Sequence, residues 1–209
     1  ALDWLVACRD TERGLRLVGS LWMFWLFHGH LVEGLHQFGR VLALPATTTY
    51  PTLLAKALTS AGLFASFQDD DDRATQLANA ALSIWQDLPA HQQRGSSIAL
   101  FVLASVAMQR GDFVTAEARV SEMLPLARRT NDGFGIRCAL AMRGVIAGNS
   151  GNLTESRRDF EECLEHSRTA GDELHVATML ANLAVLEQVS GRYASARPLL
   201  EEAIEIQRR

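Results

Sequence analysis

The feature that most constrains this chain is an internal repeat of about 40 residues, which occurs five times. Its anchors lie 40, 42, 40 and 40 residues apart, at Gly29, Asp69, Gly111, Gly151 and Gly191. A small side chain follows each anchor by five residues, at Gly34, Ala74, Ala116, Ser156 and Ala196. An aliphatic side chain precedes each anchor by eleven residues, at Val18, Leu58, Leu100, Leu140 and Leu180. A period of this length predicts a stack of similar units that bury apolar faces against their neighbours.

Residues 96–129 show what each repeat is expected to form. The first half carries apolar residues in a helical rather than an alternating pattern. Gly111-Asp112 then breaks the pattern, because a helix end favours glycine with positive φ and aspartate caps the next helix. A periodic apolar stripe predicts a second helix after this turn. The predicted helix-turn-helix repeats cover residues 11–46, 50–88, 92–130, 132–170 and 172–209.

Two further positions of the repeat have a structural interpretation. Small residues are expected where the two helices of a repeat cross, and the pairs are Ala104 with Ala116, Gly144 with Ser156, and Ala184 with Ala196. Acidic residues nineteen positions before an anchor are expected to cap the first helices, at Asp10, Asp132 and Asp172.

Composition narrows the class of protein. Hydrophobic residues make up 48% of the chain, charged residues make up 21%, and the formal net charge is −4. A mildly acidic chain gives no electrostatic reason to expect nucleic-acid binding. The longest apolar run, residues 17–27, is interrupted by Gly19 and Ser20 and is too short to span a bilayer. No membrane partner is therefore expected.

The cysteines indicate the cellular compartment, and the ends of the sequence indicate whether it is a fragment. Cys8, Cys138 and Cys163 are odd in number and lie at no metal-site spacing, which predicts reduced core thiols in a cytoplasmic protein. No secretory signal peptide is visible. Because the sequence starts and stops inside helical patterns, we expect it to be a piece of a larger protein.

The turn sequences resemble those of the tetratricopeptide repeat. Residues 111–116 read Gly-Asp-Phe-Val-Thr-Ala, residues 151–156 read Gly-Asn-Leu-Thr-Glu-Ser, and residues 191–196 read Gly-Arg-Tyr-Ala-Ser-Ala. The resemblance implies an all-α fold, a right-handed α-α superhelix (solenoid) of five repeats in a single domain over residues 1–209. The chain departs from the family in its period, which exceeds the usual length of about 34 residues. It also lacks the family's proline after the second helix.

The first repeat is similar to a narrower group. Residues 21–25 read Leu-Trp-Met-Phe-Trp and are followed by Gly29 and Glu33-Gly34, as at the start of the helical-repeat region of large bacterial LuxR-type (STAND) signalling ATPases. This similarity implies a non-catalytic protein-interaction scaffold, the sensor or regulatory arm of a bacterial signalling or transcriptional regulator. The alternative is an arm of the same kind of regulator that binds a small-molecule inducer.

A partner-binding surface is implied by the resemblance, because first helices line the concave side of such stacks. The expected partner is a protein or peptide segment, including other domains of the parent chain. The surface is mostly apolar, which suits a hydrophobic segment laid along it. The expected groove residues are Phe101, Val102, Ser105, Met142, Val145, Thr178, Asn182 and Gln188.

Two clusters of polar residues contain side chains that can ligate metal ions. Asp69 to Asp72 could form a cation site or contact a basic partner, but the run lacks the glycine and distal glutamate of an EF-hand loop. A solvated turn with capping aspartates is the preferred interpretation. His28, His30 and His36 lack a supporting acidic or cysteine ligand and are expected to be ordinary turn and surface histidines. No metal, cofactor or catalytic centre is predicted.

The first helix of repeat one is rich in aromatic residues. Trp22, Phe24, Trp25 and Phe27 could form a ligand box, although core packing is the preferred interpretation. Any of these rings that are exposed would form an apolar patch, through which the protein could self-associate.

Overall fold

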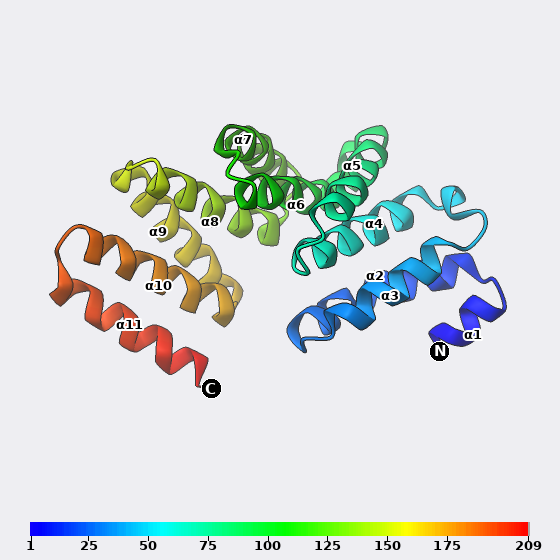
Figure 1. The fold of residues 1–209 in the computed structure, drawn as a ribbon, viewed down its shortest axis with the longest axis horizontal. Helices are drawn as coiled ribbons and strands as arrows, with labels where there is room; N and C mark the ends of the chain where they lie inside the picture. The colour runs from blue at the N-terminus through cyan, green and yellow to red at the C-terminus, as the bar shows by residue number, and fades with distance from the viewer. Residues whose placement is uncertain (209) are drawn as a thin grey trace. The chain divides into compact units, whose positions relative to one another are not determined.

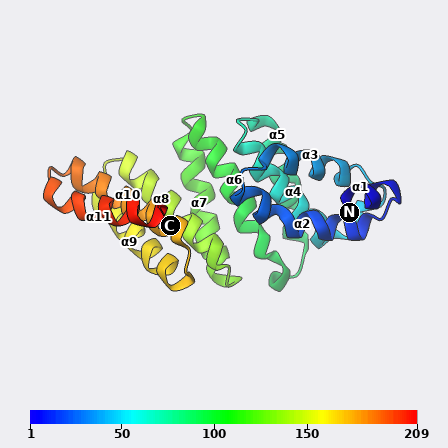
Figure 2. The same cartoon turned by 90° about the horizontal axis from the view of Figure 1, so that it is seen from below.

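The computed structural model describes residues 1–208, and every regular element in that range is helical. Contacts between Cα atoms divide the chain into two compact units, the first from Ala1 to Asn131 and the second from Asp132 onward. Figure 1 and Figure 2 show each unit as a series of helical hairpins. The single-domain organisation over residues 1–209 stays a prediction.

The first unit contains three hairpins, preceded by a short helix. In each hairpin the two long helices pack against each other, and α4 also contacts α2, α3 and α6. The helices of this unit are α1 (Leu2–Ala7), α2 (Thr11–Phe27), α3 (Leu31–Leu42), η1 (Thr47–Thr49), α4 (Pro51–Ser66), α5 (Asp71–Asp87), η2 (Ala90–Gly95), α6 (Ser96–Gln109) and α7 (Phe113–Arg129).

The second unit contains two hairpins. Helix α10 packs against α11 and also against α9 of the preceding hairpin, as expected when neighbouring repeats share a core. The helices of this unit are α8 (Gly133–Asn149), α9 (Leu153–Ala170), α10 (Glu173–Val189) and α11 (Tyr193–Gln207).

All five repeat anchors have positive φ. Gly29, Gly111, Gly151 and Gly191 lie between +73° and +80°, and Asp69 has a φ of +57°. A left-handed residue ends the first helix of each hairpin and reverses the chain, and glycine adopts this conformation without steric cost. Aspartate tolerates the same region better than most side chains do, which explains how Asp69 replaces glycine in the second repeat.

Side-chain caps begin half of the long helices within residues 1–208. The side chains of Asp10, Asp70, Asp112, Asn152 and Asp172 each accept a hydrogen bond from the backbone N–H three residues later. The predicted caps at Asp10, Asp112 and Asp172 are therefore confirmed. The prediction for Asp132 is wrong in part, because Asp132 occupies the N-cap position of α8 but its side chain makes no capping hydrogen bond. Its side chain is buried instead.

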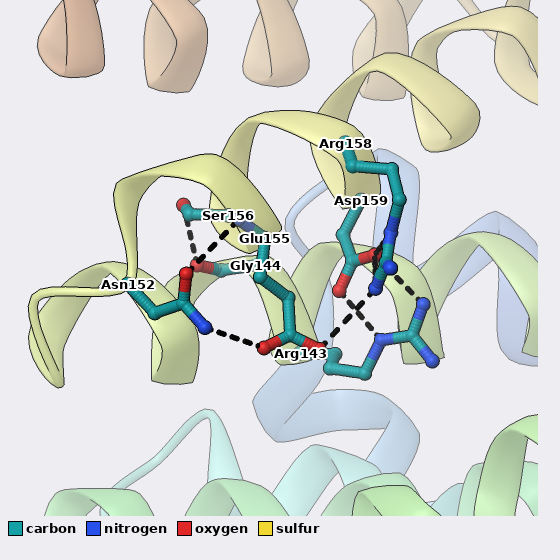
Figure 3. A network of polar contacts seen from close by, with 7 residues as sticks. All are labelled: Arg143, Gly144, Asn152, Glu155, Ser156, Arg158 and Asp159. Atoms are coloured by element: carbon teal, nitrogen blue, oxygen red, sulfur yellow. Dashed lines mark hydrogen bonds and ion pairs between the residues drawn. The ribbon is translucent and has the colours of Figure 1, made fainter.

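Small residues allow the helices of a hairpin to approach closely. Ala104, Ala116, Ala184 and Ala196 are all buried. In the α8–α9 hairpin the Ser156 hydroxyl donates a hydrogen bond of 2.7 Å to the carbonyl oxygen of Gly144 (Figure 3). The predicted pairing of Gly144 with Ser156 is therefore confirmed.

Aromatic rings form part of the core of the first unit. Phe38 makes edge-to-face contacts with Trp25 and Phe64, at centroid distances of 5.7 and 5.6 Å. Cys138 and Cys163 are buried free thiols, as predicted, whereas Cys8 is exposed and is not a core residue. The exposure of Cys8 follows from its position in the turn between α1 and α2.

Candidate partner-binding surface

The first helix of the third hairpin contributes little of the expected binding surface. Phe101 and Ser105 on α6 are half-buried. Val102 is fully buried in the core of the first unit, among residues that include Phe38 and Phe64. Val102 cannot touch a partner, so its assignment to the groove is wrong. The family resemblance implies both Phe101 and Val102 as groove residues, but only the packing of α6 shows which of the two faces inward.

The second unit presents a clearer surface on α10. Five residues at spacings of four, four, three and four lie along one face of this helix, and we call them the α10 stripe: Leu174, Thr178, Asn182, Val185 and Val189. Leu174, Val185 and Val189 are 55%, 52% and 67% exposed, respectively. Large apolar side chains with this much exposed surface along one helix face are typical of sites that bind another protein segment.

Polar groups in the α10 stripe differ in their availability. The Thr178 hydroxyl donates to the Leu174 carbonyl oxygen at 2.8 Å, so its proton is already engaged. The Asn182 amide is half-buried and forms no hydrogen bond within residues 1–208. An amide carries two donors and one acceptor, which can bind the backbone of an extended peptide. Gln188 is exposed at the edge of this face.

Met142 and Val145 on α8 are half-buried, and the charged residue between them is neutralised. Arg143 binds the carboxylate of Asp159 through two hydrogen bonds, of 2.5 Å from Nε and 2.7 Å from Nη2 (Figure 3). Asp159 is fully buried and also accepts hydrogen bonds from Arg158. Bidentate pairing of this kind holds both groups in fixed positions, so α8 presents a rigid, neutral environment.

A second ion-pair network lies at the end of α10. The buried Glu187 carboxylate accepts hydrogen bonds from Arg192 and from Arg157 of the preceding hairpin. These hydrogen bonds lower the pKa of Glu187 below its ordinary value. Glu187 therefore remains charged and paired, and it links α9 to α10 instead of facing a partner.

Three side chains of the second unit, one buried and two half-buried, have the order of a catalytic triad. The Sγ atom of Cys138 lies 3.9 Å from Nε2 of His175, and Nδ1 of His175 lies 3.0 Å from Oδ2 of Asp172. Burial raises the pKa of the Cys138 thiol and lowers the pKa of His175. A protonated, buried thiol is a poor nucleophile and cannot meet a substrate. We therefore assign the Cys138 thiol to the core of the second unit.

The sequence did not reveal this cluster because its members belong to different repeats. Cys138 and His175 lie 37 residues apart, on α8 and α10. Their only sequence signal is that this separation is close to one repeat length, which places both residues near the same level of adjacent first helices.

The aspartate run forms a capped turn, as predicted. Asp70 caps α5, while Asp71 and Asp72 form ion pairs with Arg110, at 3.2 and 2.8 Å. The basic group that they contact therefore belongs to the same chain. Asp69 supplies the left-handed turn residue. Each of the four residues thus has a structural role.

The three histidines of the first repeat do not converge. The rings of His28 and His30 stack on Phe24, at centroid distances of 4.5 and 6.0 Å. His36 is exposed on α3. Within residues 1–208, no group of three or more histidine, cysteine or acidic side chains could hold a metal ion.

The aromatic residues of α2 divide between the core and the surface. Trp25 is buried and Trp22 is half-buried against the core, in line with the packing interpretation. Phe24 and Phe27 are about half exposed, so core packing does not describe them. They lie near the turn into α3, where Phe24 stacks on the rings of His28 and His30. Self-association through these rings stays a prediction.

No helix within residues 1–208 is both long and apolar enough to pass through a lipid bilayer.

Similar proteins share the helical-repeat architecture. The apo form of RapI matches with a TM-score of 0.68 at 12% identity, over 92% of this chain and 53% of that chain. A Rap protein in complex with competence and sporulation factor matches with a TM-score of 0.80 at 12% identity, over 92% and 54%. A putative kinesin light chain of Podosopora anserina with nearly identical TPR-like repeats matches with a TM-score of 0.62 at 16% identity, over 92% of this chain and 94% of that chain.

These similarities show the fold, and the chain spans about half the length of the two Rap chains. No curated protein matches the chain in sequence. The all-α helical-repeat fold expected from the sequence is confirmed. Residues 135–209, which cover nearly the whole second unit, match the tetratricopeptide repeat family.

Proposed function

We propose that this protein is a non-catalytic interaction scaffold, and that the α10 stripe binds an apolar segment of a partner protein. The observation that carries the proposal is the line of exposed apolar side chains at Leu174, Val185 and Val189, with the unbonded amide of Asn182 between them. Apolar contacts would supply affinity, and the amide would fix the position of the peptide backbone. The Rap protein in complex with competence and sporulation factor gives a precedent for partner binding by a similar fold.

The biological setting is part of the same proposal. The similarity of residues 21–34 to the repeat region of LuxR-type signalling ATPases supports a sensor or regulatory arm of a bacterial signalling or transcriptional regulator. Such an arm would act in the cytoplasm and without a cofactor. Its partner would be another protein or another domain of the parent chain.

Peptide selection tests the α10 stripe. A phage-displayed peptide library is selected on the wild-type protein, and the recovered peptides are measured against Val185→Glu. Because a buried carboxylate beside an apolar ligand is costly, we expect affinity to fall by at least about tenfold. Circular dichroism checks that the variant is folded.

The matched control is Val114→Glu, since Val114 is an 81% exposed valine on α7, outside the stripe. It should leave peptide affinity unchanged. Selected peptides that bind Val185→Glu as tightly as wild type would remove the α10 stripe from consideration. An inducer-binding arm would then become the better proposal.

A further inference from the structure

A hollow in the first unit is lined by basic, polar and apolar side chains. It has a volume of about 480 Å³ and lies between α3 and the start of α5. Helix α4 packs against both of these helices. None of the described residues that line the hollow is acidic, and its side-chain wall consists of Val32, Leu35, His36, Arg40, Gln68 and Arg73. We call it the Arg73 hollow.

The repeat pattern shows that the first repeat differs from the later ones at a position beside this hollow. The residue ten positions after the anchor is Gly39 in the first repeat. In the other four repeats this position holds Asn79, Ser121, Glu161 and Glu201. A Cβ added at Gly39 would meet only Nη2 of Arg73, at 3.7 Å. Glycine inside a helix costs about 1 kcal/mol relative to alanine. No close packing contact explains this glycine, and its missing side chain leaves space in front of Arg73.

The next position reverses the local charge. Arg40 stands where the last three repeats have Glu122, Glu162 and Glu202. A face that is acidic in those repeats therefore carries a guanidinium in the first one. Asp71 and Asp72, which neighbour Arg73 in sequence, form ion pairs with Arg110 and do not line the hollow.

Both guanidinium groups have free donors. The Arg73 side chain forms no hydrogen bond or ion pair within residues 1–208. Arg40 uses only Nη1, which donates to Asp3 and Gln37, and leaves Nε and Nη2 without partners there. The Gln68 amide donates to the carbonyl oxygens of Leu31 and Phe64 instead. The donors available to a ligand therefore come from the two arginines and His36.

An acidic side chain of the same chain already shows what Arg40 binds. Oδ1 of Asp3 lies 2.5 Å from Nη1 of Arg40, although the Asp3 side chain is 85% exposed. Asp3 belongs to the short helix α1, and its neighbours Leu2 and Val6 pack against the core. Arg40 thus binds a carboxylate that is presented by a peptide segment with apolar residues beside it.

We propose that the Arg73 hollow binds an acidic peptide segment, with a partner carboxylate between Arg73 and Arg40 and a neighbouring apolar side chain on Val32 and Leu35. Arginine suits this role because its planar fork of N–H donors matches a carboxylate. Asp3 belongs to the same chain and competes with the partner carboxylate for Nη1 of Arg40. The site belongs to the first unit and is independent of the α10 stripe.

The test uses ¹⁵N NMR of the whole protein with two capped tripeptides, acetyl-Val-Asp-Val-amide and its asparagine analogue. The aspartate peptide should produce saturable shifts at the Gly39 amide and the Arg73 side-chain N–H, and the asparagine peptide should not. Arg73→Gln should weaken binding by at least about tenfold, because hydrogen bonds to charged groups are the strong ones. Asp3→Asn should tighten binding by about two- to fivefold.

Two further variants sharpen the result. Gly39→Glu introduces the residue that the last two repeats have at this position, and it should abolish binding while it favours the helix. Arg13→Gln removes an exposed arginine of α2 away from the hollow and should change nothing. Equal shifts with both peptides, or unchanged binding by Arg73→Gln, would overturn the proposal. Acetate shifting the same signals at equal or lower concentration would also overturn it, because the site would then bind a free anion.

Discussion

At the scale of single residues, the glycines of this chain have two different roles. The anchor glycines reverse the backbone, and no neighbouring atom lies within 4 Å of an added Cβ at any of them. Gly144 is different, because it lies inside α8 where an added Cβ would stand 2.5 Å from a ring atom of Phe160. The close contact with Phe160 requires glycine at this position, although glycine destabilises a helix interior.

Two substitutions in helix interiors separate these effects. Gly144→Ala should destabilise the protein by about 1–3 kcal/mol, because the methyl group overpacks the contact with Phe160. Gly39→Ala meets only the end of Arg73 and should stabilise by about 0.5–1 kcal/mol through helix propensity alone. Urea unfolding followed by circular dichroism measures both. If both substitutions raise the free energy of unfolding, the contact with Phe160 does not limit the side chain at position 144.

At the scale of elements, helix starts are set by side-chain caps that recur with the repeat. Asn152 caps α9 by accepting a hydrogen bond of 3.2 Å from the backbone N–H of Glu155, and its amide donates to the Glu155 carboxylate (Figure 3). A cap of this kind satisfies a backbone donor that the helix itself leaves unpaired. Each such helix start is thus fixed by local contacts within four residues.

Replacing this cap tests its contribution. Asn152→Ala should cost about 1 kcal/mol, whereas Asn152→Asp keeps the acceptor and should stay within about 0.5 kcal/mol of wild type. Thermal melting of the three proteins gives the comparison. If the alanine and aspartate variants melt together, the bond from Glu155 contributes nothing measurable.

At the scale of the whole molecule, the chain consists of two compact units. Stacks of repeats are stabilised by contacts within each repeat and with its nearest neighbours rather than by one global core. Local opening can therefore occur in one part of the chain while another remains closed.

Hydrogen exchange of the Gly144→Ala variant examines this division. The substitution lies in α8, so we expect faster amide exchange in α8 to α11 and little change in α2 to α5. Mass spectrometry of peptic fragments resolves the two regions. Uniform acceleration along the chain would mean that both units open as one cooperative body.

The repeat, the hairpin turns and most of the caps follow from the amino-acid sequence. These depend on short-range properties, namely the positive φ of the anchor residues and the hydrogen bonds of capping side chains to nearby backbone. Which face of each helix is covered depends on how the helices pack. This packing buried Val102, exposed Phe24, and brought Cys138 to His175 across a repeat. It also placed Arg73 in front of Gly39, because side chains from separate repeats meet only when the helices pack.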